Sequence, residues 1–322
     1  MATTLPDLGP ADADLRGADF SGCTFAGIDL RGRPLAGVTL ADADFRGVDL
    51  RETDLSGAIL TGATFADADL RGCTITNALL RRADFSGADL RGTRFEGCLL
   101  DDARFEGADL TGVAIVESAV RRGQFRGTSM VRADLRASVF DHADFAGCDL
   151  SDAVLKEASG PEASFLRARL HAADFATSVF PRARFVEADA TRAVFSEALL
   201  DEAVFVRATF RAATLSGASL RRADLSGCDF SGAKLSVTIC DRATLGGAVF
   251  AATTADMASF EFADLQGARF EASDFVFAVL IGADLRGARA QSTRFHGADF
   301  HWARLDGVDL GDCATAEARM PV

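Results

Sequence analysis

Residues 83–92 read ADFSGADLRG and contain two consecutive copies of a five-residue unit. Each copy places a small residue two positions before a large apolar one. Every fifth residue from Leu15 to Leu310 lies on this large register, and fifty-five of its sixty positions are Leu, Phe, Ile, Val or Met. The small register begins at Ala13, and fifty-eight of its sixty positions are Ala, Cys, Ser, Thr, Val or Gly. A period of five fits neither an amphipathic helix nor an alternating strand, so it indicates a repeat architecture.

Triplets such as Ala68-Asp69-Leu70 and Ala223-Asp224-Leu225 resemble the unit of the pentapeptide-repeat family, commonly written A-[D/N]-L-x-x. The resemblance covers almost the whole chain. It implies an all-β fold, a right-handed quadrilateral parallel β-helix in which four units make one coil and both registers point inward. Sixty units would then give about fifteen coils.

A coil of twenty residues would bring positions twenty apart into columns, and the sequence supports this. Of the twenty-six phenylalanines, twenty-four lie on the large register. One inward column is phenylalanine without a break: Phe25, Phe45, Phe65, Phe85, Phe105, Phe125, Phe145, Phe165, Phe185 and Phe205.

The unbroken pattern predicts one solenoid over 13–310, with an N-terminal cap over 1–12 and a C-terminal cap or dimerisation segment over 311–322. The pattern weakens over 156–164, where Gly160-Pro161 replaces a large inward residue and its neighbour. Because the register continues on both sides, we expect a local softening or bend here and no inserted loop.

The seven cysteines all lie on the inward registers, so we expect them to fill the core as small apolar residues. An odd number of cysteines without a C-x-x-C motif suits a reducing compartment. Residues 1–10 lack the features of a signal peptide, and no run of eighteen apolar residues could span a membrane. We therefore expect a cytoplasmic protein. Arg33 breaks the small register and must turn outward or find partners.

Catalytic groups do not converge in this pattern. The four histidines lie on outward positions, and a catalytic or metal site needs side chains that meet in a sheltered concavity. The sequence therefore predicts no enzyme, no metal, no cofactor and no small-molecule substrate.

The net charge of −13 argues against direct nucleic-acid binding and points to a basic partner. Residues 1–160 hold 26 acidic and 17 basic side chains, and residues 161–322 hold 21 and 17. Five aspartates on one face form a column: Asp29, Asp49, Asp69, Asp89 and Asp109. They resemble a phosphate backbone, but Arg31, Arg51, Arg71 and Arg91 run beside them. Partner binding and stabilising pairs between coils both remain open.

One group of outward residues is apolar where the repeat is otherwise polar. It consists of Phe262, Val276, Phe277, Ile281, His301 and Trp302. Exposed aromatic residues at one place suggest an interface with a partner or with a second copy. The alternative is that a terminal segment folds back over them.

Two functions fit these features. The chain resembles the branch of the family in which an acidic rod-shaped dimer mimics duplex DNA and occupies the DNA-binding saddle of a type II topoisomerase, DNA gyrase, modulating its activity or drug sensitivity. The alternative is a structural or protein-interaction scaffold with an unidentified protein partner. In either case the C-terminal coils are expected to form a homodimer contact, because a solenoid must cap or pair its open ends.

Overall fold

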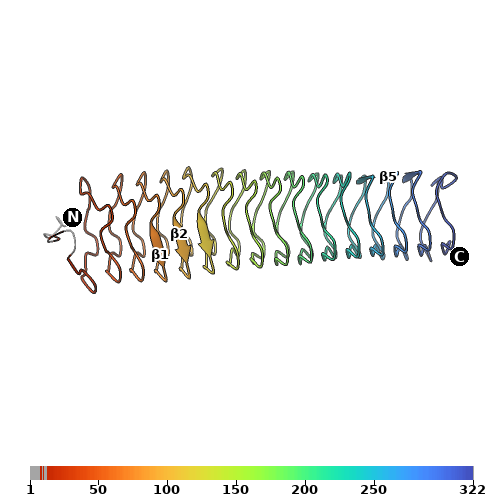
Figure 1. The fold of residues 1–322 in the computed structure, drawn as a ribbon. Coiled ribbons are helices and arrows are strands. Elements are labelled where there is room, and N and C mark those ends of the chain that lie inside the picture. Colours follow the sequence, from red (N-terminus) through yellow and green to blue (C-terminus); the bar gives the residue numbers. More distant parts are fainter. Residues whose placement is uncertain (1–7, 9, 11–12, 322) are drawn as a thin grey trace. The chain divides into compact units, whose positions relative to one another are not determined.

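The computed structural model describes residues 8, 10 and 13–321. The chain divides into two compact units, residues 1–163 (unit 1) and residues 164–322 (unit 2). Figure 1 shows the coils of unit 1 in red to yellow-green and those of unit 2 in green to blue. The described residues contain no helix, and every pairing described below is parallel. The all-β parallel solenoid predicted from the repeat is therefore confirmed.

In unit 1, three short strands form a parallel sheet in the order β1-β2-β3. Strand β1 spans Thr74–Thr76, β2 spans Arg94–Glu96 and β3 spans Ala114–Val116. Their partners are twenty residues apart, since Ile75 pairs with Phe95. Single parallel bridges with the same spacing run through the rest of the unit, from Asp19 to Ser159. Each coil of unit 1 therefore uses twenty residues, as the columns predicted.

In unit 2, the parallel sheet has the order β4-β5-β6. Strand β4 spans Val249–Ala251, β5 spans Arg269–Glu271 and β6 spans Arg289–Gln291. Bridges twenty residues apart extend from Ser164 to Arg319. The segment 311–322, expected as a cap or dimerisation segment, thus continues the ladder at Ala314 and Arg319.

The boundary between the units lies inside the segment 156–164 that the sequence marks as soft. Within unit 1 the backbone pairing reaches this segment, because His142 N donates to Pro161 O at 3.0 Å. A single solenoid over 13–310 with about fifteen coils stays a prediction. The predicted N-terminal cap, 1–12, lies outside the described residues except for Leu8 and Pro10.

A turn after most of the large residues gives the repeat its length of five. In one copy, Ala88 N donates to Phe85 O at 3.0 Å, which closes a four-residue turn. Gly87 in this turn has a φ of 71°, a left-handed conformation that glycine adopts without steric cost. Turns of this kind at the corners of the coils separate the short extended segments and turn both registers inward.

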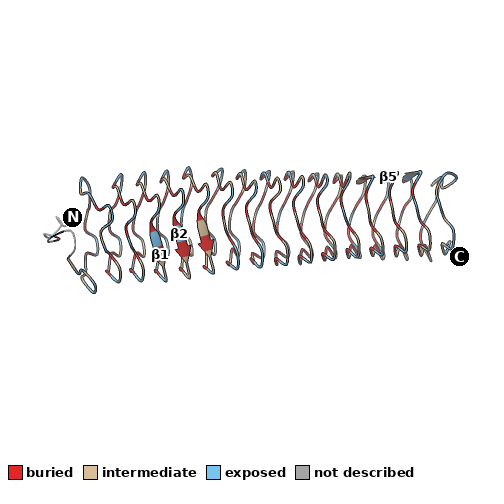
Figure 2. Ribbon diagram, viewed as in Figure 1, coloured by how far each residue is buried: buried red, intermediate tan, exposed pale blue. Residues whose placement is uncertain are grey.

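The core of each unit is a set of stacked columns. Figure 2 shows the buried residues, in red, recurring along every coil. In unit 1, the ring centroids of Phe45 and Phe65 are 4.9 Å apart and their planes differ by 4°. In unit 2, Phe185 and Phe205 stack at 4.6 Å. The spacing follows the separation of neighbouring strands, about 4.8 Å, so one column takes one ring from each coil.

The departures from the registers are accommodated locally. Six of the seven cysteines are buried and all are free, and burial raises the pKa of the Cys73 thiol to about 12. The Cys73 thiol donates to Leu50 O at 2.7 Å. Arg33 finds a partner, since its Nη1 donates to Leu8 O at 3.4 Å. Gly160 remains buried at its inward position.

The packing predicts a large difference between inward and outward phenylalanines. Phe125 is fully buried and stacks on Phe105 at 4.6 Å and on Phe145 at 4.7 Å. We expect Phe125→Ala to lower the free energy of unfolding by about 3–5 kcal/mol, because a cavity opens inside the column. The control is Phe277→Ala at an exposed site, where the loss should stay within about 0.5 kcal/mol. Chemical denaturation compares the two, and equal losses would contradict this account of the core.

Candidate interaction surfaces

One column of outward aspartates in unit 1 is paired with arginines. We call this set the Asp–Arg ladder: Asp29, Asp49, Asp69, Asp89, Asp109, Arg31, Arg51, Arg71 and Arg91. Arg31 donates to Asp29 through Nη2 at 2.7 Å and through Nε at 3.0 Å. The backbone N–H of Arg71 donates to Asp69 Oδ1 at 3.2 Å, as in an Asx turn. The turn thus places each arginine beside the aspartate two residues before it.

The same arginines also reach the next coil. Arg31 Nε lies 3.5 Å from Asp49 Oδ2, and Arg71 Nε lies 3.5 Å from Asp89 Oδ2. The corresponding distances are 3.6 Å for Arg51 and Asp69 and 3.7 Å for Arg91 and Asp109. Each guanidinium therefore lies between two carboxylates, and five carboxylates share four guanidiniums.

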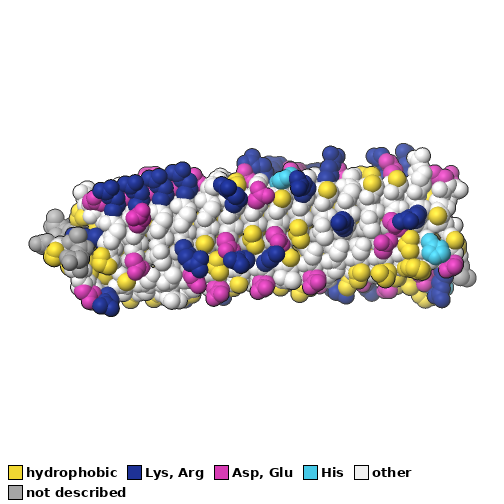
Figure 3. Space-filling view, viewed as in Figure 1, with side chains coloured by type: hydrophobic (Ala, Val, Ile, Leu, Met, Phe, Trp, Pro, Cys, Tyr) yellow, Lys and Arg dark blue, Asp and Glu magenta, His cyan; other side chains and the backbone are white. Residues whose placement is uncertain are grey.

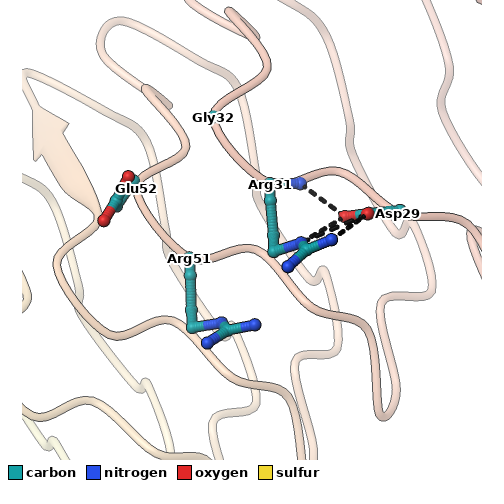
Figure 4. A pocket seen from close by; sticks show the side chains of 5 residues that line it. All are labelled: Asp29, Arg31, Gly32, Arg51 and Glu52. Carbon is teal, nitrogen blue, oxygen red and sulfur yellow. Dashed lines mark hydrogen bonds and ion pairs between the residues drawn. The ribbon is translucent and has the colours of Figure 1, made fainter.

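This arrangement bears on the two interpretations of the aspartate column. The ladder is nearly charge-balanced, and it matches the second interpretation, stabilising pairs between coils. Asp29, Arg31, Gly32, Arg51 and Glu52 line a shallow hollow of about 370 Å³. Figure 4 shows Arg31 turned onto Asp29 there. Partner binding at these aspartates stays a prediction.

The ion pairs shift the titration of the carboxyls. The hydrogen bond from the Arg31 guanidinium lowers the pKa of Asp29 from 3.8 to about 2, and Arg71 lowers the pKa of Asp69 in the same way. Because these pKa values are lowered in the folded state, each pair stabilises the fold above the ordinary carboxyl pKa. That contribution is lost as the pH falls through the lowered pKa. Solvent exposure keeps it small.

Unit 2 carries a second surface, which we call the apolar patch: Val237, Met257, Phe262, Phe277 and Trp302. Their exposed fractions lie between 51% and 63%. Val237, Met257 and Phe277 occupy one turn column, and Phe262 and Trp302 occupy the turn column five residues further on. The two columns bound one face of the unit. Figure 3 shows hydrophobic side chains gathered toward the C-terminal end of unit 2, beside a histidine.

All five side chains of the apolar patch lie at positions with a left-handed backbone. Their φ values run from 55° to 60°. Among the described residues other than glycine with positive φ, these five are the large apolar ones. A bulky or β-branched residue in this conformation is strained by about 1–2 kcal/mol relative to glycine. The same conformation recurs at this turn position along the whole described chain, where the other non-glycine side chains are small or polar, so the large apolar character of these five is what suggests a use.

Neighbouring residues hold the two phenylalanine rings in place. A Cβ atom on Gly282 would clash with the Phe262 ring, and one on Gly297 would clash with the Phe277 ring. Each ring therefore lies directly over a glycine of the next coil. The Arg242 guanidinium is 5.6 Å from the centre of the Phe262 ring, and the His296 ring is 5.6 Å from that of Phe277.

The predicted interface residues lie at or near the apolar patch. Phe262, Phe277 and Trp302 belong to it. Val276, Ile281 and His301 are half-buried beside it, and the His301 ring is 4.3 Å from that of Trp302. The alternative, that a terminal segment folds back over these residues, is wrong for the described chain, because Trp302 is 63% exposed.

Two members of the apolar patch were missed from the sequence, Val237 and Met257. Both lie on the same turn column as Phe277, at spacings of twenty, so reading that column would have found them. Ile239 and Val279 lie half-buried on the face between the two columns and extend its apolar character.

The part of the chain that the structure describes holds no group of three or more His, Cys, Asp or Glu residues placed to bind a metal ion. None of its described segments is a helix with the length and apolarity needed to cross a bilayer.

A family model described as pentapeptide repeats matches the chain in 8 copies, over residues 11–32, 40–77, 78–113, 124–157, 168–205, 203–239 and 273–312. No curated protein matches the chain.

Several solved structures are similar to the chain. HetL, a pentapeptide repeat protein involved in heterocyst differentiation regulation from the cyanobacterium Nostoc sp., is 28% identical; the match covers 67% of this chain and 91% of HetL, with a TM-score of 0.31. QnrB1, a plasmid-mediated fluoroquinolone resistance protein, is 17% identical over 60% of this chain and 93% of its own, with a TM-score of 0.34. A pentapeptide repeat protein from the thylakoid lumen of Arabidopsis thaliana is 31% identical over 33% of this chain and 66% of its own, with a TM-score of 0.14.

The Asp–Arg ladder can be tested by titration. In the wild type, Asp29 should titrate with a pKa of about 2. We expect Arg31→Gln to raise that pKa toward 3.8, because the charged donor is lost. Arg82→Gln, which removes an arginine outside the ladder, should leave the pKa of Asp29 unchanged. Carboxyl NMR measures both, and an unchanged Asp29 pKa in the Arg31 variant would refute the pairing.

Proposed function

The chain belongs to the pentapeptide-repeat family, and on that premise we propose that it is a non-enzymatic scaffold that binds a protein partner through the apolar patch of unit 2. The observation that carries the proposal is the placement of five large apolar side chains at strained, exposed turn positions of one face. Single exposed apolar residues are normal on protein surfaces, but a contiguous group marks an interaction site.

The composition of the apolar patch fits a protein partner. Phe262, Phe277 and Trp302 supply the rigid aromatic area that dominates many protein interfaces. The two phenylalanine rings are already fixed over Gly282 and Gly297, so little conformational freedom would be lost on binding.

The shape of the described surface supports the proposal that the protein has no catalytic activity, cofactor or small-molecule substrate. The hollows along the described faces are shallow and lined by paired charges, such as Asp29 with Arg31. Catalysis needs converging groups in a site that excludes water. We propose a cytoplasmic location from the seven free cysteines, which suit a reducing compartment, and we propose binding to neither nucleic acid nor membrane.

The single tryptophan, Trp302, reports directly on the apolar patch. A protein captured from the cells that express this chain should shift the Trp302 emission to shorter wavelength and protect it from acrylamide. Met257→Glu with Phe277→Glu keeps the reporter and should weaken binding at least tenfold. The matched control is Leu199→Glu, an exposed apolar residue of unit 2 outside the apolar patch, which should bind as the wild type does. Equal binding by all three would contradict the proposal.

The homodimer expected through the C-terminal coils is tested by the same Trp302 measurement and by a second variant of the apolar patch. If the apolar patch joins two copies, the wild type should show a concentration-dependent Trp302 shift without any other protein. Light scattering on Phe277→Glu with Trp302→Glu should then report a folded monomer. A wild type that is a monomer at all concentrations would reject the C-terminal homodimer.

The net charge of −13 favours a second candidate function, mimicry of duplex DNA at the DNA-binding saddle of DNA gyrase. The charge is concentrated in residues 1–160, so the mimicking surface would lie in unit 1. The Asp–Arg ladder weakens this candidate, because its guanidiniums offset most of the carboxylates that would attract a basic saddle.

Gyrase supercoiling assays, with and without a fluoroquinolone, test the second candidate. Mimicry predicts inhibition at micromolar concentration or below that weakens as salt rises. Replacing Arg51 and Arg71 by Gln exposes more negative charge and should strengthen the inhibition, while Asp49→Asn with Asp69→Asn should weaken it. No inhibition at low salt would eliminate the candidate.

A further inference from the structure

One face of unit 1 carries apolar side chains where most outward positions are polar. We call this set the apolar column: Ile59, Leu79, Leu99, Ala119 and Val139. Successive members are joined by parallel bridges, so they lie on neighbouring coils. Ile59 and Leu79 are each 39% exposed, and the other three are half-buried.

A second column runs beside the first, two residues further along the chain. We call it the charge column: Arg81, Asp101, Arg121 and Asp141. Its signs alternate strictly from coil to coil. Within the chain, Asp101 Oδ2 lies 3.6 Å from Arg81 Nε, and Asp141 Oδ2 lies 3.4 Å from Arg121 Nε. Asp101 also accepts from Arg121 N at 3.1 Å and is 13% exposed, whereas Arg81, Arg121 and Asp141 are 56%, 42% and 31% exposed and can each meet a further charged group.

We propose that this face of unit 1 binds the same face of a second copy of the chain, with the two copies antiparallel. The two-fold axis runs across the face, perpendicular to the columns, and passes between the coils of Leu99 and Ala119. It places each column opposite the same column of the second copy, in reverse order. Arg81 then meets Asp141 of the second copy, and Asp101 meets Arg121 of the second copy. Because the signs alternate along the column, each charge meets a charge of opposite sign on the second copy.

The charge column selects this arrangement over the others. In a parallel pairing with its two-fold axis along the charge column, Arg81 would meet Arg81 of the second copy, and every charge would face its like. An antiparallel pairing shifted so that Arg81 meets Asp101 leaves Asp141 without a charged counterpart in the column. Only the register centred between Leu99 and Ala119 gives all four charges an opposite partner.

The rest of the face agrees with that register. In the apolar column, Leu79 meets Val139 and Leu99 meets Ala119. In the turn column that follows the charge column, Asp102 meets Arg122 of the second copy. No two like charges are brought opposite each other in these columns.

The size of the face predicts a weak dimer. From Ile59 to Ser159 it extends over five coil steps of about 4.8 Å, roughly 24 Å. A face of this length with the width of one solenoid side buries less than the roughly 800 Å² per partner of a standard interface. Dimerisation should therefore depend on concentration and weaken with salt.

Inverting all four signs provides the test. The variant Arg81→Asp, Asp101→Arg, Arg121→Asp, Asp141→Arg keeps the alternation along the chain, and therefore its pairs between coils. We expect wild type and inverted variant each to form homodimers in sedimentation at high protein concentration. Mixed dimers should be absent when differently labelled proteins are combined, because every interfacial pair would then be of like sign. Mixing in statistical proportion, or a wild type that stays monomeric, would overturn the proposal.

A single substitution covers the case in which the inverted variant does not fold. Leu79→Lys places a charge opposite Val139 of the second copy and should raise the dimer dissociation constant at least tenfold. Leu199→Lys, at the same position of the repeat in unit 2, is the matched control and should leave dimerisation unchanged. Phe277→Glu with Trp302→Glu should also leave it unchanged, which separates this surface from the apolar patch. Equal dissociation constants for the two lysine variants would also overturn the proposal.

Discussion

Each short extended segment takes its backbone hydrogen bonds from the coils on either side, at a distance of twenty residues. In unit 1, Phe45 N donates to Thr64 O at 2.8 Å and Thr64 N donates to Ala43 O at 2.9 Å. Because the register of these bonds is the same on every coil, each side chain stacks directly on the one twenty residues away. The packing of the inward side chains and the balance of charge among the outward side chains therefore both depend on which residues share a column.

Outward side chains of one column lie close enough to attract or repel one another. A column of aspartates about 4.8 Å apart would repel itself, and the Asp–Arg ladder relieves this by placing a guanidinium between successive carboxylates. The charge column of unit 1 solves the same problem by alternating its signs. The apolar patch is different: Val237, Met257, Phe262, Phe277 and Trp302 are more than half exposed, so in the described part of the chain they add little to the core. That contrast separates residues that serve the fold from residues available to a partner.

The buried residues could be predicted almost completely from the sequence. They lie on the two inward registers, which begin at Leu15 and Ala13. The division into two units at Ala163 could not, since the registers continue through Gly160 without an inserted residue. For the Asp29 column the sequence left partner binding and stabilising pairs both open, because the number of arginines beside it does not reveal that each one binds two carboxylates. The prediction of an interface found the aromatic residues but missed Val237 and Met257, whose exposure depends on the turn column and not on residue type.

The central claim is that the apolar patch, and not the Asp–Arg ladder, is the surface that meets a protein partner. Hydroxyl-radical footprinting of side chains tests it most directly, because Met257, Phe262, Phe277 and Trp302 are reactive and exposed in the isolated chain. The labelling of the purified protein is compared with that of the protein in extracts of the cells that express it. The account predicts strong protection of these four residues in the extract, with little change elsewhere in unit 2. Unprotected aromatic residues in the extract, as reactive as in the purified protein, would contradict it.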